Sequence, residues 1–244
     1  MPEGPSLVIL KEAVQAFKGK KIISTVGNSK QFDIHKLDGQ VITDFKSWGK
    51  HFLICFKKFT VRIHFMLFGS YRINEDKNTV PRLGLQFKQG QINFYACSVR
   101  FIEEDINEIY DWTADVMNPA WDPKKAKTKL RNKKDLLVCD ALLDQDIFAG
   151  VGNIIKNEVL FRIKVHPGSM VSKLPPAKLN ALIKEAVVYS FDFLKWKKEF
   201  VLKKHWLAHT KKICPRDNTP FDKKYLGKTK RRSFFCSKCQ RLYT

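Results

Sequence analysis

The chain has 244 residues, of which 45 are Lys or Arg and 24 are Asp or Glu, so its formal net charge at pH 7 is +21. Hydrophobic residues make up 44% of the chain and aromatic residues 12%, which excludes a disordered basic tail, because such tails lack apolar side chains to bury. A folded chain with this excess of positive charge favours nucleic acid as its partner, since each Lys or Arg placed against a phosphate releases condensed counterions.

The sequence has no run of about 18 apolar residues, and its first ten, MPEGPSLVIL, lack the basic start of a secretion signal. We therefore expect a cytoplasmic protein without membrane association, bound to the nucleoid if its source is bacterial. Cys55, Cys97 and Cys139 are scattered in apolar contexts and are expected in the core, as in a protein from a reducing compartment.

The first 115 residues predict a helix followed by an antiparallel β-sandwich. Apolar residues recur at helical spacing over residues 5–17, with Pro5 in the first turn. From Ile22 onward the apolar period changes to two, most clearly over residues 59–65 and 83–87. The second of these stretches and residues 92–96 flank a Gln-Gly turn, which predicts a hairpin.

A linker is predicted at residues 116–123, because two prolines interrupt the pattern there. Beyond it the sequence predicts a helical domain over residues 124–209, beginning with Asp122 as the N-cap and Pro123 in the first turn. Its helices are expected at residues 124–131, 135–143, 153–163 and 176–200. The glycine-bearing turn between the middle two either presents backbone N–H groups to a phosphate or only packs two helices tightly.

The last predicted module, residues 210–244, contains Cys214-Pro-Arg-Asp217 and Cys236-Ser-Lys-Cys239. This spacing is typical of a zinc ribbon, with Asp217 in place of one cysteine, and a carboxylate oxygen can also bind zinc. We expect one structural Zn²⁺ with an uncertain fourth ligand, or else a metal-free hairpin. The expected ligands are Cys214, Asp217, Cys236 and Cys239, and the alternatives for the fourth are His205, His209 and Asp222. The basic stretch between the two half-sites suits contact with phosphates.

Three motifs follow one another along the chain: Pro2-Glu3-Gly4-Pro5, the stretch from Leu142 to Pro167 with Gly150-Val-Gly-Asn153, and the stretch from Arg231 to Gln240. Together they resemble the formamidopyrimidine-DNA glycosylase and endonuclease VIII family of base-excision repair enzymes, over essentially the whole chain and closer to the endonuclease VIII branch. The resemblance implies an α+β protein with a catalytic β-sandwich, a helix-two-turns-helix DNA-binding domain and a zinc-finger-like hairpin. We expect a monomer that binds double-stranded DNA with oxidised bases or abasic sites.

By this resemblance, Pro2 is the catalytic nucleophile and Glu3 transfers protons. Removal of Met1 would leave a secondary amine that is partly unprotonated at neutral pH and can attack a sugar C1′ to form an iminium. The positive end of the following helix disfavours the ammonium form. A carboxyl group at position 3 can serve as general acid or base. Taken alone, Met-Pro followed by Glu is also an ordinary chain start with a helix cap.

The resemblance also implies the residues that hold DNA. Lys50 matches a β-strand lysine that contacts phosphate and assists lyase chemistry, although it is one of 45 basic residues. Asn153 and Arg231 match the pair that clamps the phosphates flanking the lesion. Glu158 matches a family carboxylate, yet an acidic residue there could simply anchor a helix pair.

A further stretch, His64-Phe-Met-Leu-Phe-Gly69, matches the loop that fills the gap left by a flipped base. Leu67 falls on the wedge position and Phe68 on an aromatic position, whereas Met66 departs from the polar residue of the endonuclease VIII branch. Periodicity alone would instead make these residues part of a core strand.

The substrate branch is indicated by Val99 and Arg100. The formamidopyrimidine branch has paired arginines that read the opposite base, but the first is Val99 here, and valine cannot donate a hydrogen bond. Only thirteen residues separate Phe200 from Cys214, too few for the lid that covers oxidised guanine in that branch. Both departures favour oxidised pyrimidines.

We therefore expect a bifunctional DNA glycosylase and AP lyase that acts through a Schiff base on its N-terminal proline and nicks the strand by β,δ-elimination. One alternative is an 8-oxoguanine or formamidopyrimidine glycosylase of the same family. Others are a catalytically inactive DNA-binding homologue and a zinc-ribbon factor that binds RNA.

Overall fold

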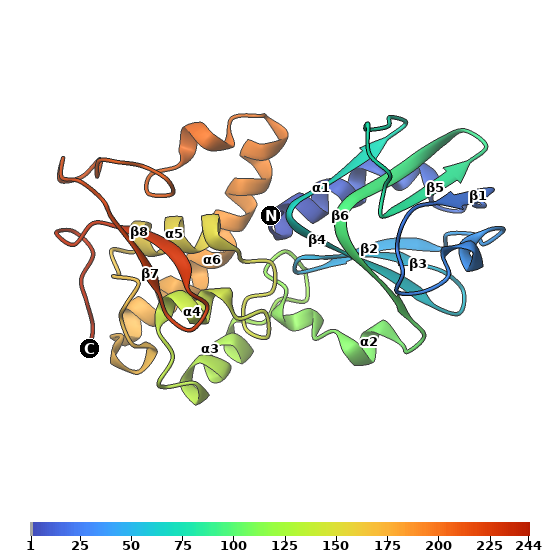
Figure 1. The fold of residues 1–244 in the computed structure, drawn as a ribbon. Coiled ribbons are helices and arrows are strands. Elements are labelled where there is room, and N and C mark those ends of the chain that lie inside the picture. The colour runs from blue at the N-terminus through green and yellow to red at the C-terminus, as the bar shows by residue number, and fades with distance from the viewer. Residues whose placement is uncertain (1) are drawn as a thin grey trace. The chain divides into compact units, whose positions relative to one another are not determined.

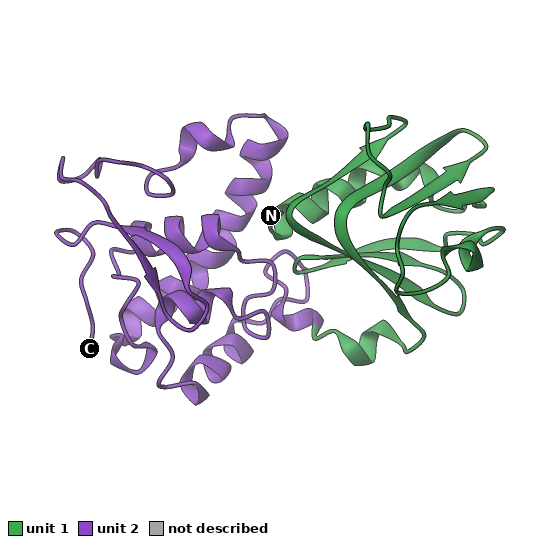
Figure 2. Ribbon diagram, in the orientation of Figure 1, with its two compact units in different colours: residues 1–111 green, residues 112–244 purple. Residues whose placement is uncertain are grey.

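The computed structural model describes residues 2–244, which divide into two compact units between Asp111 and Trp112 (Figure 2). The predicted linker, residues 116–123, belongs to the second unit, where Val116 is buried and its N–H donates to the carbonyl of Ala149 at 3.1 Å. The predicted module at residues 210–244 lies in the same unit as the helices. Among the described residues, no helix has the length and apolar character that crossing a membrane requires.

The first unit begins with α1 (Gly4–Ala13), which a single 3₁₀ turn (Gln15–Phe17) extends (Figure 1). The predicted apolar face is confirmed, because all four of its members are buried: Leu7, Leu10, Val14 and Phe17. The helix ends before the predicted Phe17 because Val14 leaves helical geometry, and the last turn tightens into the 3₁₀ form.

An antiparallel sheet of six strands follows, in the order β1-β5-β6-β4-β3-β2. The strands are β1 (Ser24–Val26), β2 (Asp44–Trp48), β3 (His51–Cys55), β4 (Thr60–Ile73), β5 (Leu83–Phe87) and β6 (Gly90–Ile102). Short helical segments lie at Ile34–Leu37 and at α2 (Ile106–Ile109). The predicted hairpin is confirmed as β5 and β6, which meet at the pair Phe87 and Gly90.

Strands β4 and β6 are long, with 14 and 13 residues, and they join the two halves of the sheet. The first part of β4 pairs with β3, whereas the first part of β6 pairs with β5. Side chains of both halves meet in one core, where the rings of Phe52 (β3) and Phe94 (β6) lie 5.9 Å apart. The predicted helix and antiparallel β-sandwich are confirmed in this form: both halves of the sandwich belong to one six-stranded sheet and share a core with α1.

The second unit contains four helices and a β-hairpin. Its helices are α3 (Pro123–Asn132), α4 (Val138–Leu143), α5 (Asn153–Arg162) and α6 (Pro176–Lys198), and its strands are β7 (Asp222–Leu226) and β8 (Arg231–Phe235). Short 3₁₀ turns lie at Trp112–Ala114, Val171–Lys173 and Leu202–His205.

The helix starts of the second unit agree with the sequence, with one exception. The predicted N-cap of α3 is confirmed, since the Asp122 carboxylate accepts from the N–H groups of Lys124 and Lys125. Helix α4 begins at Val138 and not at residue 135, because Leu137 is extended and pairs with Met170 in an isolated β-bridge.

We expect Phe52→Ala to lower the free energy of unfolding by about 3–5 kcal/mol, because the ring is fully buried and its removal leaves a cavity in the shared core. Phe68→Ala is the matched control, since that ring is 84% exposed and its loss should change stability by less than about 0.5 kcal/mol. Urea unfolding of both variants measures the difference. Similar losses in the two variants would contradict this description of the core.

Candidate functional site

Pro2 and Glu3 lie directly before α1. Glu3 is the N-cap residue, with extended backbone angles, and its carbonyl accepts the N–H of Ser6 at 2.8 Å. Its side chain is only 3% exposed, yet within residues 2–244 it makes no capping hydrogen bond to the helix. Ordinary side-chain capping therefore does not explain Glu3. Pro2 is half-buried at the positive end of the helix dipole.

Lys50 lies in the two-residue turn that joins β2 to β3, and not on a strand as predicted. The turn requires Gly49, whose φ of 55° lies in the left-handed region. The carbonyl of Lys50 accepts a hydrogen bond from Nδ1 of His64 on β4, at 3.1 Å. This bond fixes the turn against the neighbouring strand.

Two histidines beside Lys50 are held in the neutral form. Burial lowers the pKa of His51 to about 3, with the Arg62 charge as a second cause. Burial likewise lowers the pKa of His64, against the opposing effect of its hydrogen bond to the Lys50 carbonyl. Positive charge in this part of the sheet therefore comes from Lys and Arg.

Residues 66–69 form an exposed bulge in β4. Phe65 pairs with Cys97 and Ser70 with Tyr95, so the four residues between them oppose Ala96 alone. Met66, Leu67 and Phe68 are 54%, 59% and 84% exposed. The interpretation of these residues as core strand, which periodicity favoured, is wrong.

Gly69 closes this bulge. A Cβ at position 69 would lie 2.6 Å from the Cβ of Phe65 and 2.9 Å from the carbonyl oxygen of Ala96. Both distances are too short for any side chain, so only glycine lets the chain return to the strand there. The bulge keeps three apolar side chains in solvent, which is what a wedge between bases needs.

Arg100 is exposed on β6, whereas Val99 beside it is buried in the core at 1% exposure. Arg100 lies directly opposite Arg62 of β4 in the ladder. Like charges in this arrangement destabilise a sheet, and an anion nearby removes the repulsion. This face of the sheet is therefore suited to bind a phosphate.

Asn153 and Arg231, far apart in the sequence, lie close together in the second unit. Asn153 is the first residue of α5, and its Nδ2 donates to the carbonyl of Arg232 at 3.1 Å. Arg231 directly precedes Arg232, is the first residue of β8 and is exposed. The Oδ1 atom of Asn153 is buried and has no hydrogen-bond donor within residues 2–244.

Helix α5 holds β8 through two further side chains on the same face. Lys156 is completely buried, and its Nζ donates to Oγ of Ser233 at 2.8 Å and to the carbonyl of Arg232 at 3.2 Å. Nδ2 of Asn157 reaches the same carbonyl at 3.4 Å, and its Oδ1 accepts the N–H of Phe234 at 3.1 Å. No motif in the sequence marks Lys156, although its place directly after Ile154-Ile155 is unusual for a surface lysine.

Glu158 anchors the chain that follows α6. Its buried carboxylate accepts three backbone N–H groups, from Leu207 and Ala208 at 2.9 Å and from His209 at 2.7 Å. Glu158 therefore is an anchor, as the sequence alternative had it, but it holds the segment after α6 and not a pair of helices. Nδ2 of Asn157 donates to Nδ1 of His209 at 3.2 Å, and burial, followed by the Lys156 charge, lowers the pKa of His209 to about 4.

Gln145 organises the glycine-bearing turn between α4 and α5. Its Oε1 accepts the N–H of Gly150 at 3.1 Å, and its Nε2 donates to the carbonyls of Leu143 and Val151 at 2.8 and 3.2 Å. Gly150 has a φ of 100°, which only glycine adopts easily. These bonds fix the turn that leads into Asn153.

Asp140 of α4 holds the tip of the β7–β8 hairpin. Its buried carboxylate accepts the backbone N–H groups of Lys228 and Thr229 at 2.8 and 3.1 Å, and the Thr229 hydroxyl at 2.8 Å. A Cβ on Gly227 would come within 2.2 Å of this carboxylate. The hairpin is therefore docked on the helices at its tip as well as along β8.

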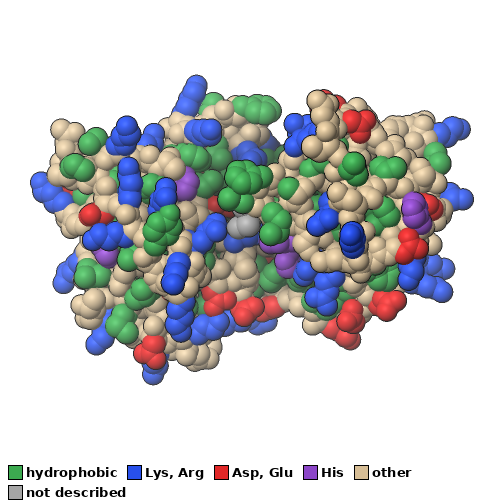
Figure 3. Space-filling model, in the orientation of Figure 1, with side chains coloured by type: hydrophobic (Ala, Val, Ile, Leu, Met, Phe, Trp, Pro, Cys, Tyr) green, Lys and Arg blue, Asp and Glu red, His purple; other side chains and the backbone are tan. Residues whose placement is uncertain are grey.

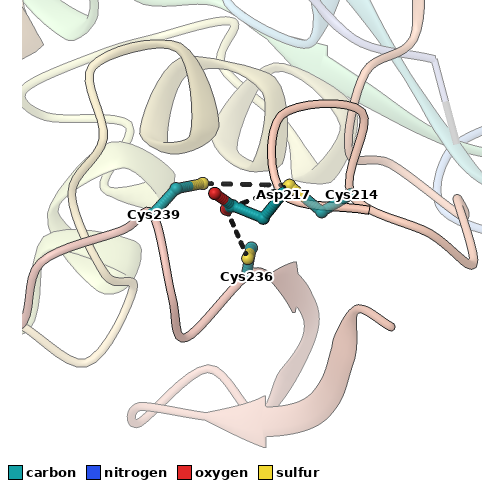
Figure 4. Close-up of side chains that lie close together, drawn as sticks. All are labelled: Cys214, Asp217, Cys236 and Cys239. Carbon is teal, nitrogen blue, oxygen red and sulfur yellow. Dashed lines mark hydrogen bonds between the residues drawn. The ribbon is translucent and has the colours of Figure 1, made fainter. Parts of the chain in front are cut away.

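The predicted metal ligands converge (Figure 4). The donor atoms of Cys214, Asp217, Cys236 and Cys239 all lie within 4.8 Å of one another. Oδ2 of Asp217 accepts from the thiols of Cys236 at 3.1 Å and Cys214 at 3.6 Å, and the sulfurs of Cys214 and Cys239 are 3.9 Å apart. A tetrahedral zinc with Zn–S bonds of about 2.3 Å separates its sulfurs by about 3.8 Å, so this donor set fits one ion.

The other candidates for the fourth ligand lie elsewhere. His205 stacks on Trp196 with ring centroids 4.1 Å apart, His209 is bound by Asn157, and Asp222 accepts from the Ser237 hydroxyl. Asp217 is therefore the fourth member of the cluster. Hydrogen bonds from the thiols, that of Cys236 first, keep the pKa of Asp217 below its usual value, so the carboxylate is in the form that binds a cation.

Lys and Arg side chains are spread over the visible face of both units, whereas Asp and Glu form smaller groups (Figure 3). This distribution accords with the net charge of +21. It gives each unit a surface that attracts a polyanion.

Comparisons with known proteins agree with this geometry. Residues 1–103 match the formamidopyrimidine-DNA glycosylase N-terminal domain, and residues 112–189 match the formamidopyrimidine-DNA glycosylase H2TH domain. Endonuclease 8-like 3 of Xenopus laevis is 30% identical over 241 residues, which cover 90% of this chain and 38% of that protein. The chain therefore spans little more than a third of that relative's length.

Two further likenesses cover more of the matched protein. The DNA-(apurinic or apyrimidinic site) lyase Nei2 of Mycolicibacterium smegmatis is 26% identical, over 75% of this chain and 71% of that protein. The crystal structure of Lactococcus lactis formamidopyrimidine-DNA glycosylase bound to DNA with an AP site has a TM-score of 0.85 and 21% identity, covering 98% of this chain and 99% of that one. At this identity the structural likeness shows the fold.

We expect Lys156→Met to lower the free energy of unfolding by about 1–3 kcal/mol, because it leaves the buried Ser233 hydroxyl and the Arg232 carbonyl without their charged donor. Lys125→Met on the exposed face of α3 is the control and should be nearly neutral. Urea unfolding measures both variants. A Lys156→Met protein as stable as the control would show that this contact contributes nothing.

Proposed function

We propose, because this chain belongs to the formamidopyrimidine-DNA glycosylase and endonuclease VIII family, that it is a DNA glycosylase with AP lyase activity. Its substrates would be oxidised bases, foremost pyrimidines, and abasic sites in double-stranded DNA. The observation that carries the proposal is the start of the first unit, where Pro2 precedes the helix and the buried carboxyl group of Glu3 does not cap it.

The chemistry would begin at the amine of Pro2, once Met1 has been removed. The amine nitrogen bonds to the sugar C1′, the base leaves with the electron pair of its glycosidic bond, and the nitrogen loses its proton, which gives an aminal. Glu3 would donate a proton to the ring oxygen, so that the C1′–O4′ bond breaks and the nitrogen lone pair forms the iminium. Loss of a C2′ proton then expels the 3′ phosphate, and a second elimination expels the 5′ phosphate. Lys50, fixed in its turn by His64, would stabilise the phosphate charge beside the reacting sugar.

Residues of both units would bind DNA. Asn153 and Arg231 would hold phosphates, because α5 places their backbone segments side by side. The exposed bulge with Met66, Leu67 and Phe68 would fill the gap left by a flipped base, and Arg100 would contact the strand nearby. The bulge and both arginines are exposed, as contact with DNA requires.

The preference for pyrimidines is supported by Val99, which is buried and has no donor to read an opposite cytosine. Two alternatives within the family remain distinct proposals: a formamidopyrimidine or 8-oxoguanine glycosylase, and a DNA-binding homologue without turnover. Incubating the protein with duplexes that contain thymine glycol, dihydrouracil, 8-oxoguanine or an abasic site distinguishes these alternatives, because only a duplex with a substrate lesion is cut.

We further propose that the protein acts as a monomer in the cytoplasm.

We also propose that the cluster of three cysteines and Asp217 holds one structural Zn²⁺. Three thiolates and one carboxylate suit zinc, and the distances between the donor atoms match a closed tetrahedron. A bound ion would tie the two half-sites of the hairpin together and leave no open position for catalysis.

We expect borohydride reduction to trap a covalent complex between the mature protein and dihydrouracil duplex, because reduction fixes an iminium as a stable amine. Peptide mapping should place the adduct at Pro2. The control is a protein with one residue added before Pro2, which turns the Pro2 nitrogen into an amide and should form no adduct at Pro2. An adduct on Lys50, or none with the mature protein, would sink this mechanism.

We expect Asp217→Ala to bind less zinc than the wild type, measured as metal per protein after extensive dialysis, because a three-donor site holds the ion less tightly. Asp217→Cys should restore full occupancy. Asp222→Ala is the control, since that carboxylate lies outside the cluster. Unchanged zinc in Asp217→Ala would show that Asp217 is no ligand.

A further inference from the structure

Phe200 occupies an unfavourable position just after the end of α6 (orange in Figure 1). Its side chain is 96% exposed, the largest fraction among the exposed large apolar side chains of residues 2–244. Its φ of 60° lies in the left-handed region, which glycine normally supplies after a helix. A single exposed apolar residue is ordinary, but here it coincides with backbone strain that glycine would relieve. Burial of the ring does not explain why phenylalanine stands here.

Backbone hydrogen bonds and an aromatic stack hold the turn that carries Phe200. The N–H of Phe200 donates to the carbonyl of Lys197 at 3.2 Å, and the N–H of Val201 donates to that of Trp196 at 2.9 Å. The Trp196 ring stacks on His205 at 4.1 Å with an angle of 7° between the planes. This stacking folds the segment after Phe200 back onto α6.

The far end of the same segment is held as well, because Glu158 of α5 accepts the backbone N–H groups of residues 207–209. An aromatic ring on a fixed turn loses little freedom when a ligand stacks on it. The turn that carries Phe200 is therefore already ordered before a ligand binds.

The surroundings of Phe200 are strongly basic. Between Asp192 and Asp217 the chain has eight Lys or Arg residues and one acidic residue, Glu199. Exposed lysines lie on both sides of the ring in the sequence: Lys195, Lys198, Lys203 and Lys204. Lys195 and Lys198, in the last turn of α6, also interact favourably with the helix dipole. Lys203 and Lys204 lie after the helix, so the dipole does not account for them.

We propose that Phe200 is a stacking platform for an unpaired nucleobase, with the lysines on either side of it holding the phosphates of the same strand. Exposed aromatic rings among basic residues are the elements of surfaces that bind single-stranded nucleic acid. A protein partner is disfavoured, because the residues flanking the ring are mainly lysines and not a continuous apolar patch. The inference rests on the proposed function in taking DNA as the ligand.

The test compares Phe200→Gly, Phe200→Trp and Phe191→Ala in binding a fluorescein-labelled, undamaged single strand and its duplex at several salt concentrations. Phe200→Gly should weaken single-strand binding roughly ten-fold with an unchanged salt slope, because stacking releases no counterions. The same variant should be at least as stable to heat as the wild type, since glycine relieves the strain. Phe200→Trp should bind like the wild type.

Phe191→Ala, also on α6 and 50% exposed, is the control and should leave affinity unchanged. Replacing Lys203 and Lys204 by Ala should lower the salt slope instead, by about 0.7 for each phosphate that these lysines no longer neutralise. Wild-type single-strand affinity in Phe200→Gly would overturn the proposal, and so would equal losses on the single strand and the fully paired duplex. Because undamaged DNA is used, this result does not depend on turnover, whereas the proposed enzyme fails only if no adduct forms at Pro2.

Discussion

The buried contact of Lys156 on α5 with Ser233 and the Arg232 carbonyl is the interaction on which the register of β8 against the helices depends. An ammonium ion removed from water is strongly destabilising unless it is hydrogen-bonded, so this side chain is tolerated only while β8 lies against α5. Asn153 and Asn157 donate to the same carbonyl from the same helix face. The register of β8 on α5 is therefore specified by charge as well as by shape, and Arg231 takes its position from that register.

The first unit exposes the apolar side chains of Met66, Leu67 and Phe68 while the strands of its sheet stay paired on both sides of them. Two long strands carry the core pairing, and the four-residue bulge interrupts only one of them. Gly69 lets the chain rejoin the ladder, and the left-handed Ala96 makes the matching bend on β6. The core beneath stays continuous, so the exposed residues can change without unfolding the domain.

Local signals in the sequence predicted much of this correctly, because they depend on neighbouring residues alone. The Asp122 cap, the long helix α6 and the β5–β6 hairpin were all accessible in this way. The spacing of the cysteines likewise predicted the cluster. The sequence did not predict contacts between distant segments. These are the burial of Lys156 against β8, the hydrogen bonds of Asp140 to the hairpin tip, and the β-bridge between Leu137 and Met170, after which α4 begins. No pattern of neighbours shows which carbonyl a side chain will meet.

These distant contacts explain why a carboxylate can stand among the cysteines. The hairpin is fastened at its tip by Asp140 and along β8 by Lys156, and both fastenings are independent of the cluster. A metal held there would add to a structure that α4 and α5 already organise. Four soft ligands are then less necessary for folding than in a ribbon that folds around its metal alone, where the ion supplies most of the folding free energy. The hairpin can thus keep Arg231 in place while Asp217 replaces a thiolate.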